Sequence, residues 1–509
     1  MNALDADIII VGAGLSGVGS ACHLKEHCPD RSVLILEGRE AMGGTWDLFR
    51  YPGIRSDSDM HTLGYNFRPW REAKAIADGP SILNYIRRTA QDHGIESLIR
   101  YGHWLKAADW CSETACWTLT VQDVANDVTI TLRSRFLLMC AGYYSYRQGH
   151  QPEFPGRETF RGDFIHPQFW PEAFDAHGKR IVVIGSGATA MTLVPELAKT
   201  AAEVTMLQRS PTYVITRPAR DRVANMLRRL LPESWAYAAT RWKNTTMQQW
   251  LYRRSRKSPE QLKNYLIGEV RKKVGDTVDV DRHFTPSYNP WDQRLCLVPD
   301  DDLFDALRGG RARVVTDHIS RLTESGIELA SGETLEADTI VSATGLELVI
   351  MGDAAFSVDG KAVDFANTWT YKGIMCSDLP NLVSVFGYIN ASWTLRADLT
   401  AEWFCRLLNH MRDDGVDVAV PRVPEELQSM PDRDWIDDFS AGYMRRVMHR
   451  FPRQGDRAPW VNPQDYRRDR ELFLKSPIDD GSLYFAPAPT SLSEETQDSG
   501  RVRNTQVVA

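Results

Sequence analysis

The stretch VGAGLSG, Val11–Gly17, decides the fold of the first part of this 509-residue chain. It follows the apolar run Asp7–Val11, which predicts a buried strand, and it precedes Val18–Leu24, which predicts a helix. The turn between them carries the motif G-x-G-x-x-G, formed by Gly12, Gly14 and Gly17. The first glycine permits a tight turn, the second lets the backbone approach a pyrophosphate, and the third lets the helix pack on the strand. The first N–H groups of the helix are then free to bind phosphate.

An acidic residue completes this pattern at the expected distance. Ser32–Leu36 predicts a second strand, and Glu37 follows it, about 20 residues after the glycines, where a carboxylate binds a ribose hydroxyl. With strand, helix and acid all in register, the sequence predicts a dinucleotide-binding, Rossmann-like unit.

A second nucleotide signature begins at Arg180–Ile184, an apolar strand. It continues through Gly185, Ser186, Gly187, Ala188 and Thr189 into a helix that reaches Leu197. The next strand, Glu203–Leu207, is followed by Gln208, Arg209 and Ser210. A basic residue here accommodates a 2′-phosphate, so Arg209 favours NADP over NAD. The alternative is that Arg209 is a solvated surface arginine.

Composition limits the classes of function. The chain is too long for one core, so we expect two or three domains in an α/β fold. The net charge of −7 argues against nucleic-acid binding. The eight cysteines are scattered and favour a reducing cytoplasm, and no spacing of Cys or His indicates a metal site. We expect neither a signal peptide nor a membrane span.

The region 215–292 predicts a helical insertion rich in Arg, Lys and Trp. Its helices are expected at Met226–Leu231, Trp235–Trp250 and Gln261–Val274, and Trp235 and Trp242 share one helical face. The favoured interpretation is a roof over the substrate site that packs on its own protein. Because a basic helix with tryptophans can also lie on a membrane surface, peripheral membrane contact through 226–274 remains an alternative.

The loop Gly43–Asp57 lies where α/β sheets bind ligands, at the carboxyl ends of the first strands. Two nucleotide units suggest a nicotinamide that gives a hydride to a flavin. A disulfide acceptor would need a cysteine pair beside the flavin, and this loop has no cysteine. The residues alone leave quinone and O2 open as the final acceptor.

The segment between the two glycine motifs resembles a known family. Phe160, Gly162, His166, Trp170 and Pro171 match F-x-G-x-x-x-H-x-x-x-W-P, the fingerprint of class I Baeyer–Villiger monooxygenases. The resemblance extends from about Asp7 to Asp480. GGTWDLFRYPGIRSDSDM, IGSGATA, LQRSPTY, YNPWDQRLCLVP and GYINASWTL resemble the ethionamide-activating monooxygenases of actinobacteria, and also flavin monooxygenases implicated in long-chain alkane use.

This resemblance implies a mechanism with FAD, NADPH and O2. NADPH reduces FAD, and O2 then gives a C4a-peroxyflavin that inserts oxygen into a ketone, yielding an ester or lactone, or oxygenates a sulfide or thioamide. Arg294 matches the catalytic arginine of the family, a fixed cation that would stabilise the negative charge. Asp57 matches the flavin-side aspartate that orients it. The alternative is a buried Arg–Asp pair that only links domains.

The resemblance also implies the cofactor contacts. Those to FAD are Gly12, Gly14, Ser16, Gly17, Glu37, Gly44, Thr45, Trp46, Asp47 and Asp57. Those to NADP are Arg55, Ser56, Gly185, Ser186, Gly187, Ala188, Thr189, Arg209 and Ser210. His166 and Trp170 would couple the moving domains. Gln293 departs from the family, many members of which have a lysine there that touches the 2′-phosphate, so the strictness of NADPH over NADH stays open.

We therefore expect two dinucleotide-binding, Rossmann-like domains with a helical insertion. The predicted parts are an FAD-binding domain at 1–145 and 371–486, a linker at 146–175, an NADP-binding domain at 176–214 and 293–370, the insertion at 215–292, and a disordered tail at 487–509. The partners expected are a small apolar substrate and O2. The alternatives are a long-chain alkane hydroxylase and a low-turnover flavin- or lipid-binding protein. Physiological substrate and oligomeric state are not fixed by the sequence.

Overall fold

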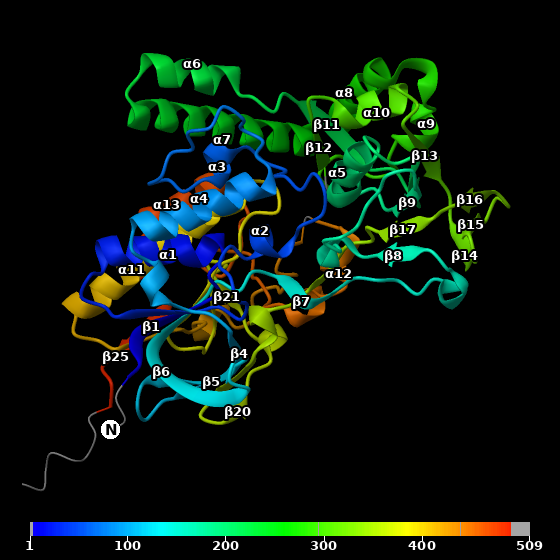
Figure 1. The fold of residues 1–509 in the computed structure, drawn as a ribbon. Helices are drawn as coiled ribbons and strands as arrows, with labels where there is room; N and C mark the ends of the chain where they lie inside the picture. Colours follow the sequence, from blue (N-terminus) through cyan, green and yellow to red (C-terminus); the bar gives the residue numbers. More distant parts are fainter. Residues whose placement is uncertain (1–3, 294, 438, 490–509) are drawn as a thin grey trace, which may run out of the picture.

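The computed structural model describes residues 4–293, 295–437 and 439–489. Two α/β units stand side by side, each built on its own sheet, and a helical hairpin crosses above the first (Figure 1). The predicted α/β class with Rossmann-like units is confirmed. Arg294 and most of the predicted tail, 490–509, lie outside the described residues.

The first unit begins as the glycine motif predicts. β1 (Ala6–Val11), α1 (Leu15–His27) and β2 (Val33–Leu36) form a βαβ unit in which β1 and β2 are parallel. Ile8, Ile9 and Ile10 are fully buried because both faces of the sheet are covered. α11 (Trp393–Asp413) packs beside α1 on one face.

One long strand joins the two halves of this sheet. β6 (Val128–Met139) pairs antiparallel with β5 (Cys116–Asp123) and then parallel with β1. Ser134 is in register with Trp117 on one side and with Ala6 on the other. β6 is therefore continuous through this change of partner.

The strand order of the nine-stranded first sheet is β20-β19-β4-β5-β6-β1-β2-β3, and β23 also pairs with β6. The further strands are β3 (Ile99–Arg100), β4 (His103–Cys111), β19 (Ala355–Val358), β20 (Lys361–Ala362) and β23 (Leu382–Ser384). β19 pairs with the open edge of β4. The chain therefore returns to the first sheet at Ala355, before the predicted domain boundary at 371.

The second unit holds a five-stranded parallel sheet in the order β13-β10-β9-β17-β8. Its strands are β8 (Asp163–Ile165), β9 (Arg180–Ile184), β10 (Glu203–Gln208), β13 (Ala312–Thr316) and β17 (Thr339–Ser342), and α5 (Ala188–Leu197) follows β9. β8 comes from the predicted linker, 146–175, so part of that segment forms the edge of this sheet.

The two glycine motifs close against matching partners. A Cβ on Gly12, whose φ is +105°, would lie 2.5 Å from the carbonyl oxygen of Cys140. A Cβ on Gly185, whose φ is +134°, would lie 2.4 Å from that of Ala343. In both units the first glycine thus touches the end of a neighbouring strand, just before the small-residue turn there, and no side chain fits between them.

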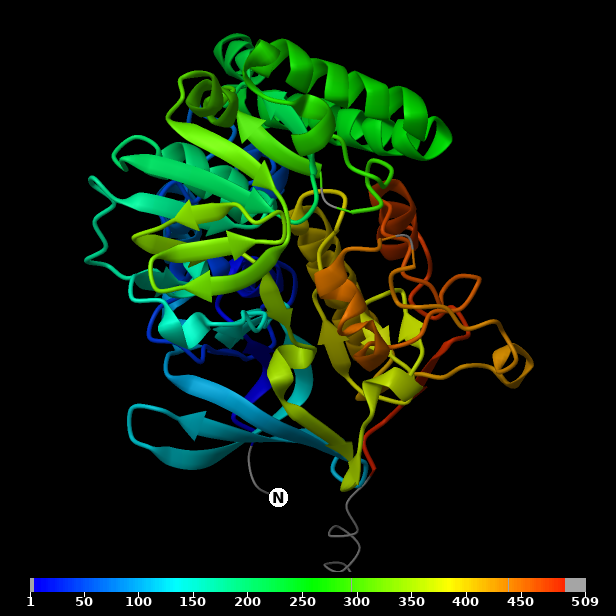
Figure 2. The ribbon, with the colours of Figure 1, turned by 90° about the vertical axis from the view of Figure 1, so that its right-hand side faces the viewer.

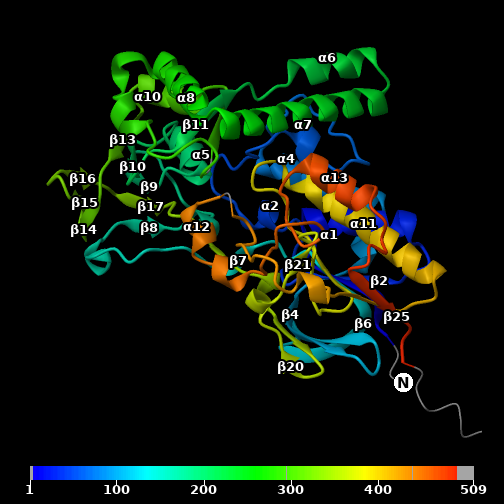
Figure 3. The same cartoon turned by 180° about the vertical axis from the view of Figure 1, so that it is seen from behind.

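The insertion leaves the second unit at β11 (Tyr213–Arg217) and returns at β12 (Leu295–Pro299), which pair in parallel. Between them lie α6 (Arg222–Leu230), α7 (Glu233–Lys257), α8 (Pro259–Val274) and α9 (Val280–His283). α6 and α7 run side by side over the first unit, as seen from the front in Figure 1 and from behind in Figure 3. α7 packs on α3 (Met60–Leu63), where the Tyr237 hydroxyl donates to the carbonyl of Tyr65 at 2.8 Å.

Smaller elements connect these layers, and Figure 2 shows the carboxyl-terminal ones beside the second unit. They are α2 (Thr45–Leu48), α4 (Gly79–Asp92), β7 (Tyr144–Gly149), α10 (Asp302–Arg308), β14 (Ile319–Thr323), β15 (Gly326–Leu329), β16 (Thr334–Glu336), β18 (Leu346–Leu348), β21 (Thr370–Tyr371), β22 (Met375–Cys376), β24 (Val418–Pro421), α12 (Gly442–Arg445), α13 (Tyr466–Leu474) and β25 (Leu483–Ala486). Among the described helices, none is both long and apolar enough to span a bilayer.

Candidate active site

Residues of both glycine motifs meet around one space, which we call the central cavity, of about 280 Å³. Ten predicted cofactor residues line it: Gly14, Ser16, Gly44, Thr45, Trp46, Arg55, Ser56, Asp57, Ala188 and Thr189. The first eight come from the first unit and the last two from the start of α5. The cavity therefore offers one place where two nucleotide cofactors could approach each other.

A smaller space of about 70 Å³, the edge cavity, adjoins the central cavity through Ala141, Tyr144 and Tyr146. Gly12 and Glu37, two of the predicted FAD contacts, line it. The ring of Trp104 also lines it and lies 6.2 Å from that of Tyr146. Together the two cavities run from the acid after β2 to the loop around Asp57.

Glu37 is 2% exposed, and backbone N–H groups hold its carboxylate in place. Its carboxylate accepts hydrogen bonds from the backbone N–H of Ala13 at 2.8 Å and from that of Arg39 at 3.0 Å. Burial raises the pKa of Glu37 above its usual value. Since a carboxylate accepts about four hydrogen bonds, two remain for ribose hydroxyls.

The glycine turn fits a pyrophosphate. α1 has no side chain capping its first N–H groups, which are therefore free for an anion. A Cβ on Gly14 would meet only the backbone of Gly44, at 3.5 Å, so these two backbone segments leave room beside them. A Cβ on Gly17 would lie 1.8 Å from the carbonyl oxygen of Gly12, so only glycine fits there.

Asp47, a predicted FAD contact, lines neither the central cavity nor the edge cavity. Its buried carboxylate pairs with Arg39 at 2.8 Å and with Arg87 at 3.2 Å. These pairs join α2 to α4 and to the turn after β2. Asp47 thus holds the loop that carries Thr45 and Trp46.

In the second motif the structure brings Ser186 and Ser210 together. The Ser186 hydroxyl donates to the carbonyl of Ser210 at 3.1 Å, and α5 has Gly187 as its N-cap residue and therefore no side-chain cap. Arg209 is exposed, and the structure shows no ion pair between it and any other described residue. This arrangement leaves the guanidinium and the first N–H groups of α5 available to phosphates.

Arg55 bridges the two units. Its guanidinium hydrogen-bonds the carboxylate of Asp302, the first residue of α10. Asp57, two residues on, is exposed and lines the central cavity. Because Arg294 lies outside the described residues, the predicted pair of Asp57 with Arg294 stays a prediction.

His166 connects the linker to the turn after β17. Its Nε2 lies 3.1 Å from the carbonyl oxygen of Gly345, and its Nδ1 accepts from the backbone N–H of Gln168 at 3.2 Å. A Cβ on Gly149 would lie 2.0 Å from the imidazole, so β7 also touches it. Burial lowers the pKa of His166, so the ring is neutral at neutral pH. Trp170 packs edge-on against Phe174, with ring centres 5.2 Å apart.

Aromatic residues that were not predicted as contacts also line the central cavity, among them Tyr143, Tyr388 and Trp393. The Trp393 indole donates to the Ser16 hydroxyl at 2.8 Å and stacks on Tyr143 at 5.1 Å. The Tyr388 hydroxyl donates to the fully buried Asp469 at 2.7 Å. Tyr388 and Trp393 belong to GYINASWTL, so this stretch of the family resemblance could have identified them as site residues.

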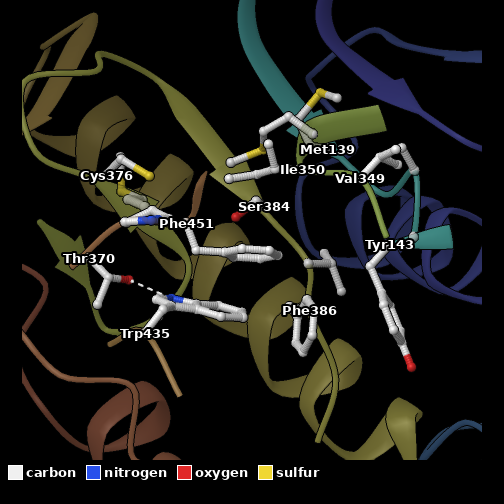
Figure 4. Close-up of a pocket in the computed structure, with 17 residues that line it drawn as sticks. Met139, Tyr143, Val349, Ile350, Thr370, Cys376, Ser384, Phe386, Trp435 and Phe451 are labelled. Atoms are coloured by element: carbon white, nitrogen blue, oxygen red, sulfur yellow. Dashed lines mark hydrogen bonds between the residues drawn. The ribbon is translucent and has the colours of Figure 1, made fainter. Parts of the chain in front are cut away.

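Tyr143 also lines a second, small apolar cavity of about 40 Å³, shown in Figure 4. Tyr143 and Phe386 form one side of it and Phe451 another. Trp435 crosses Phe386 edge-on at 4.6 Å, and its indole donates to Thr370 at 3.3 Å. The carboxyl-terminal segment therefore supports the cavity wall from behind.

Two further spaces lie under the insertion. The hairpin cavity, of about 370 Å³, shares Asp57, Ser58 and Ala391 with the central cavity. The outer cavity, of about 500 Å³, shares four side chains with the hairpin cavity: Ile215, Arg217, Met247 and Leu251. The predicted roof over a substrate site thus corresponds to a real space beneath α6 and α7.

Residues 76–412 match the family model described as flavin-binding monooxygenase-like, and 10–78 match a NAD(P)-binding Rossmann-like domain. The chain is 50% identical over 490 residues to the FAD-containing monooxygenase EthA of Mycobacterium tuberculosis, covering 96% of this chain and 99% of that protein. The chain belongs to the flavin-binding monooxygenase family. This confirms the predicted family and an oxidoreductase that binds flavin.

Other relatives and solved structures agree with this membership. The probable FAD-binding monooxygenase AlmA of Acinetobacter baylyi is 45% identical over 492 residues, covering 96% of this chain and 98% of that protein. The structure of an oxidized steroid monooxygenase bound to NADP matches 95% of this chain and 99% of its own with a TM-score of 0.77 at 20% identity. OTEMO complexed with FAD and NADP matches 95% and 100% with a TM-score of 0.73 at 20% identity. At such identities these two structures support the fold.

Proposed function

We propose that this flavin-binding monooxygenase uses FAD, NADPH and O2 to insert oxygen into small apolar ketones and to oxygenate sulfides or thioamides. The observation that carries this proposal is the central cavity, where Gly14 of the first nucleotide motif and Gly44 of the loop after β2 lie with Ala188 and Thr189 of the second motif. FAD, when bound, would take a hydride from NADPH and react with O2. The residues of the chain would bind, orient and shield these reactants.

Each nucleotide has its own set of groups. The free N–H groups of α1, with Gly14 and Gly44, would hold the pyrophosphate of FAD, and Glu37 would accept from its ribose. α5, Ser210 and Arg209 would hold NADPH. Since Arg209 is the one predicted side-chain cation for the 2′-phosphate, NADPH preference depends on it.

The oxygen-transfer step needs a fixed positive charge, because attack on a ketone places negative charge on oxygen. Arg294 would supply that charge and Asp57 would orient it. A preorganised cation in a water-poor site is often the largest catalytic contribution. The aromatic wall of Trp46, Tyr143 and Trp393 would keep water from the reacting atoms.

Product analysis tests the proposal. The FAD-loaded protein is incubated with NADPH and air in the presence of a ketone, a sulfide or a long-chain alkane. The proposal predicts an ester or lactone and a sulfoxide. A terminal alcohol as the main product would instead favour the second candidate, alkane hydroxylation, for which the outer cavity offers room for a chain. Absence of substrate-stimulated NADPH oxidation would favour a flavin- or lipid-binding protein.

Peripheral membrane contact through 226–274 stays a proposal with its own observation. Trp235, Trp242 and Trp250 on α7 are 70%, 71% and 63% exposed. α7 packs on its own protein, as the favoured interpretation expected, but through other side chains, such as Tyr237 and Asn244. The exposed Arg254 and Lys257 follow this stripe, as in helices that bind anionic lipid surfaces.

A further inference from the structure

The hairpin cavity has an apolar interior and a cationic edge. Ile215, Met247, Leu251 and Ile389 line its interior. Three arginines from one short segment, Arg217–Arg222, also line it: Arg217, Arg220 and Arg222. Arg217 is half-buried at the end of β11, whereas the other two are exposed. None of the three lines the central cavity.

The backbone that carries these arginines is fixed between the two units. Ala219, at the middle of the segment, is buried, and its N–H donates to the carboxylate of Asp300 at 2.9 Å. Its carbonyl accepts from the N–H of Ala75 at 2.7 Å and from that of Ile76 at 3.0 Å. The three guanidinium groups therefore start from a defined backbone rather than from a free loop.

Two of the three aspartates that line the hairpin cavity, Asp59 and Asp221, are already engaged, and the third, Asp57, lies at the end shared with the central cavity. Asp221 accepts from Lys243 at 2.8 Å and from the N–H of Ala224 at 2.9 Å, which caps α6. Asp59 accepts from Asn244 at 2.8 Å and from Gln248 at 3.2 Å. In the described part of the chain, Arg217, Arg220 and Arg222 form no ion pair, although Arg220 and Arg222 flank Asp221 in the sequence.

We infer that the hairpin cavity selects apolar substrates that carry a carboxylate, which Arg217, Arg220 and Arg222 bind while the alkyl part fills the cavity. This inference rests on the proposed function and names the substrate class of that site. A guanidinium binds a carboxylate through two parallel hydrogen bonds, so the arginines would fix both place and orientation. The end shared with the central cavity, at Asp57 and Ala391, would then receive the group to be oxygenated.

The experiment compares acids with their methyl esters, both in binding and in turnover. Calorimetry measures binding of a saturated fatty acid and of its methyl ester to the FAD-loaded protein, and neither ligand contains a ketone. Turnover uses a straight-chain methyl ketone that ends in a carboxylate, and the methyl ester of that ketone. We expect the acid to be preferred about tenfold or more in both assays, as charge-assisted hydrogen bonds allow.

The double variant R220Q/R222Q should lose this preference, while its Kd for the ester and its KM for NADPH stay as in the parent. R229Q is the matched control, because Arg229 is exposed on α6, the helix that begins at Arg222, and does not line the hairpin cavity. Equal binding of acid and ester by the parent would overturn the inference. A raised KM for NADPH in the double variant would also overturn it, by assigning these arginines to the nucleotide. Acid-selective binding without ketone oxygenation would support the inference and contradict the proposed function.

Discussion

Single glycines determine whether the nucleotide turns can form. Gly12 and Gly17 have no room for a Cβ, and their spacing in the sequence made both predictable. The roles of Tyr143 and Trp393 were not predictable in the same way. Trp393 reaches Ser16, 377 residues away, only because α11 packs beside α1, and Tyr143 stacks on Trp393 there.

Replacing Gly17 by alanine should prevent the first turn from closing. The new Cβ would lie 1.8 Å from the backbone oxygen of Gly12, which cannot move without displacing β1. We expect a loss of bound FAD and a fall in unfolding free energy of about 3 kcal/mol or more. Flavin content and thermal denaturation measure both. Gly187→Ala is the control, since nothing lies within 4 Å of its Cβ, and it should fold and keep FAD.

Replacing Arg294 by alanine should separate the two half-reactions. Hydride transfer from NADPH does not need this cation, so anaerobic flavin reduction should keep nearly its parent rate. Ester formation should fall by about 10²–10³-fold, the usual effect of removing one preorganised charge or donor. Stopped-flow reduction and product analysis give the two rates. An unchanged rate of ester formation would show that Arg294 has no catalytic role.

At the level of strands and helices, local pattern predicted most elements but not their partners. The three insertion helices occur where the apolar spacing placed them. The pairing of β19 with β4 joins residues about 250 apart, and no local pattern encodes such a contact. The change of partner of β6 at Ser134 likewise depends on the whole sheet and not on a local pattern.

An ion pair at the start of two neighbouring strands gives the second sheet a pH dependence. The Arg180 guanidinium, on β9, hydrogen-bonds Asp338 before β17 at 2.8 Å and lowers the pKa of that carboxyl to about 2. A lowered pKa adds stability above the unfolded value near 3.8, and this is lost as pH falls toward 2. The pair is partly exposed, so we expect less than about 1 kcal/mol.

Asp338→Asn tests this pair through denaturant unfolding between neutral pH and pH 2. The variant should be slightly less stable than the parent at neutral pH, and the difference should vanish toward pH 2. Added salt should also reduce it at neutral pH, because the charges are exposed to solvent. A difference that stays constant with pH would mean that hydrogen bonding alone, without charge, accounts for it.

Across the whole molecule, the insertion gives one surface an unusual character. Nine of the fourteen exposed large apolar side chains among the described residues lie between Val223 and Tyr265. The sequence predicted the helices and the shared face of Trp235 and Trp242. It could not show whether that face points toward solvent. Contacts such as that of Tyr237 with Tyr65 determine which face of α7 packs on the protein.

If this surface contacts membranes, the protein should float with vesicles that contain anionic lipids. Changing Trp235, Trp242 and Trp250 to serine should abolish flotation and leave turnover of a water-soluble ketone nearly unchanged, because two of them line no cavity and Trp250 lines only the outer one. Phe169→Ser removes an exposed aromatic side chain elsewhere and should have no effect. Flotation that is absent in the parent, or retained in the triple variant, would exclude this surface as the membrane contact.

The central claim is that the space between the two nucleotide motifs carries out oxygen transfer from O2 to an organic substrate. The most direct measurement incubates the FAD-loaded protein with NADPH, a ketone and O2 labelled with the heavy oxygen isotope, and analyses the product by mass spectrometry. The account predicts an ester that contains one labelled oxygen atom for each NADPH consumed. NADPH consumption that yields only hydrogen peroxide, with the ketone recovered unchanged, would contradict it.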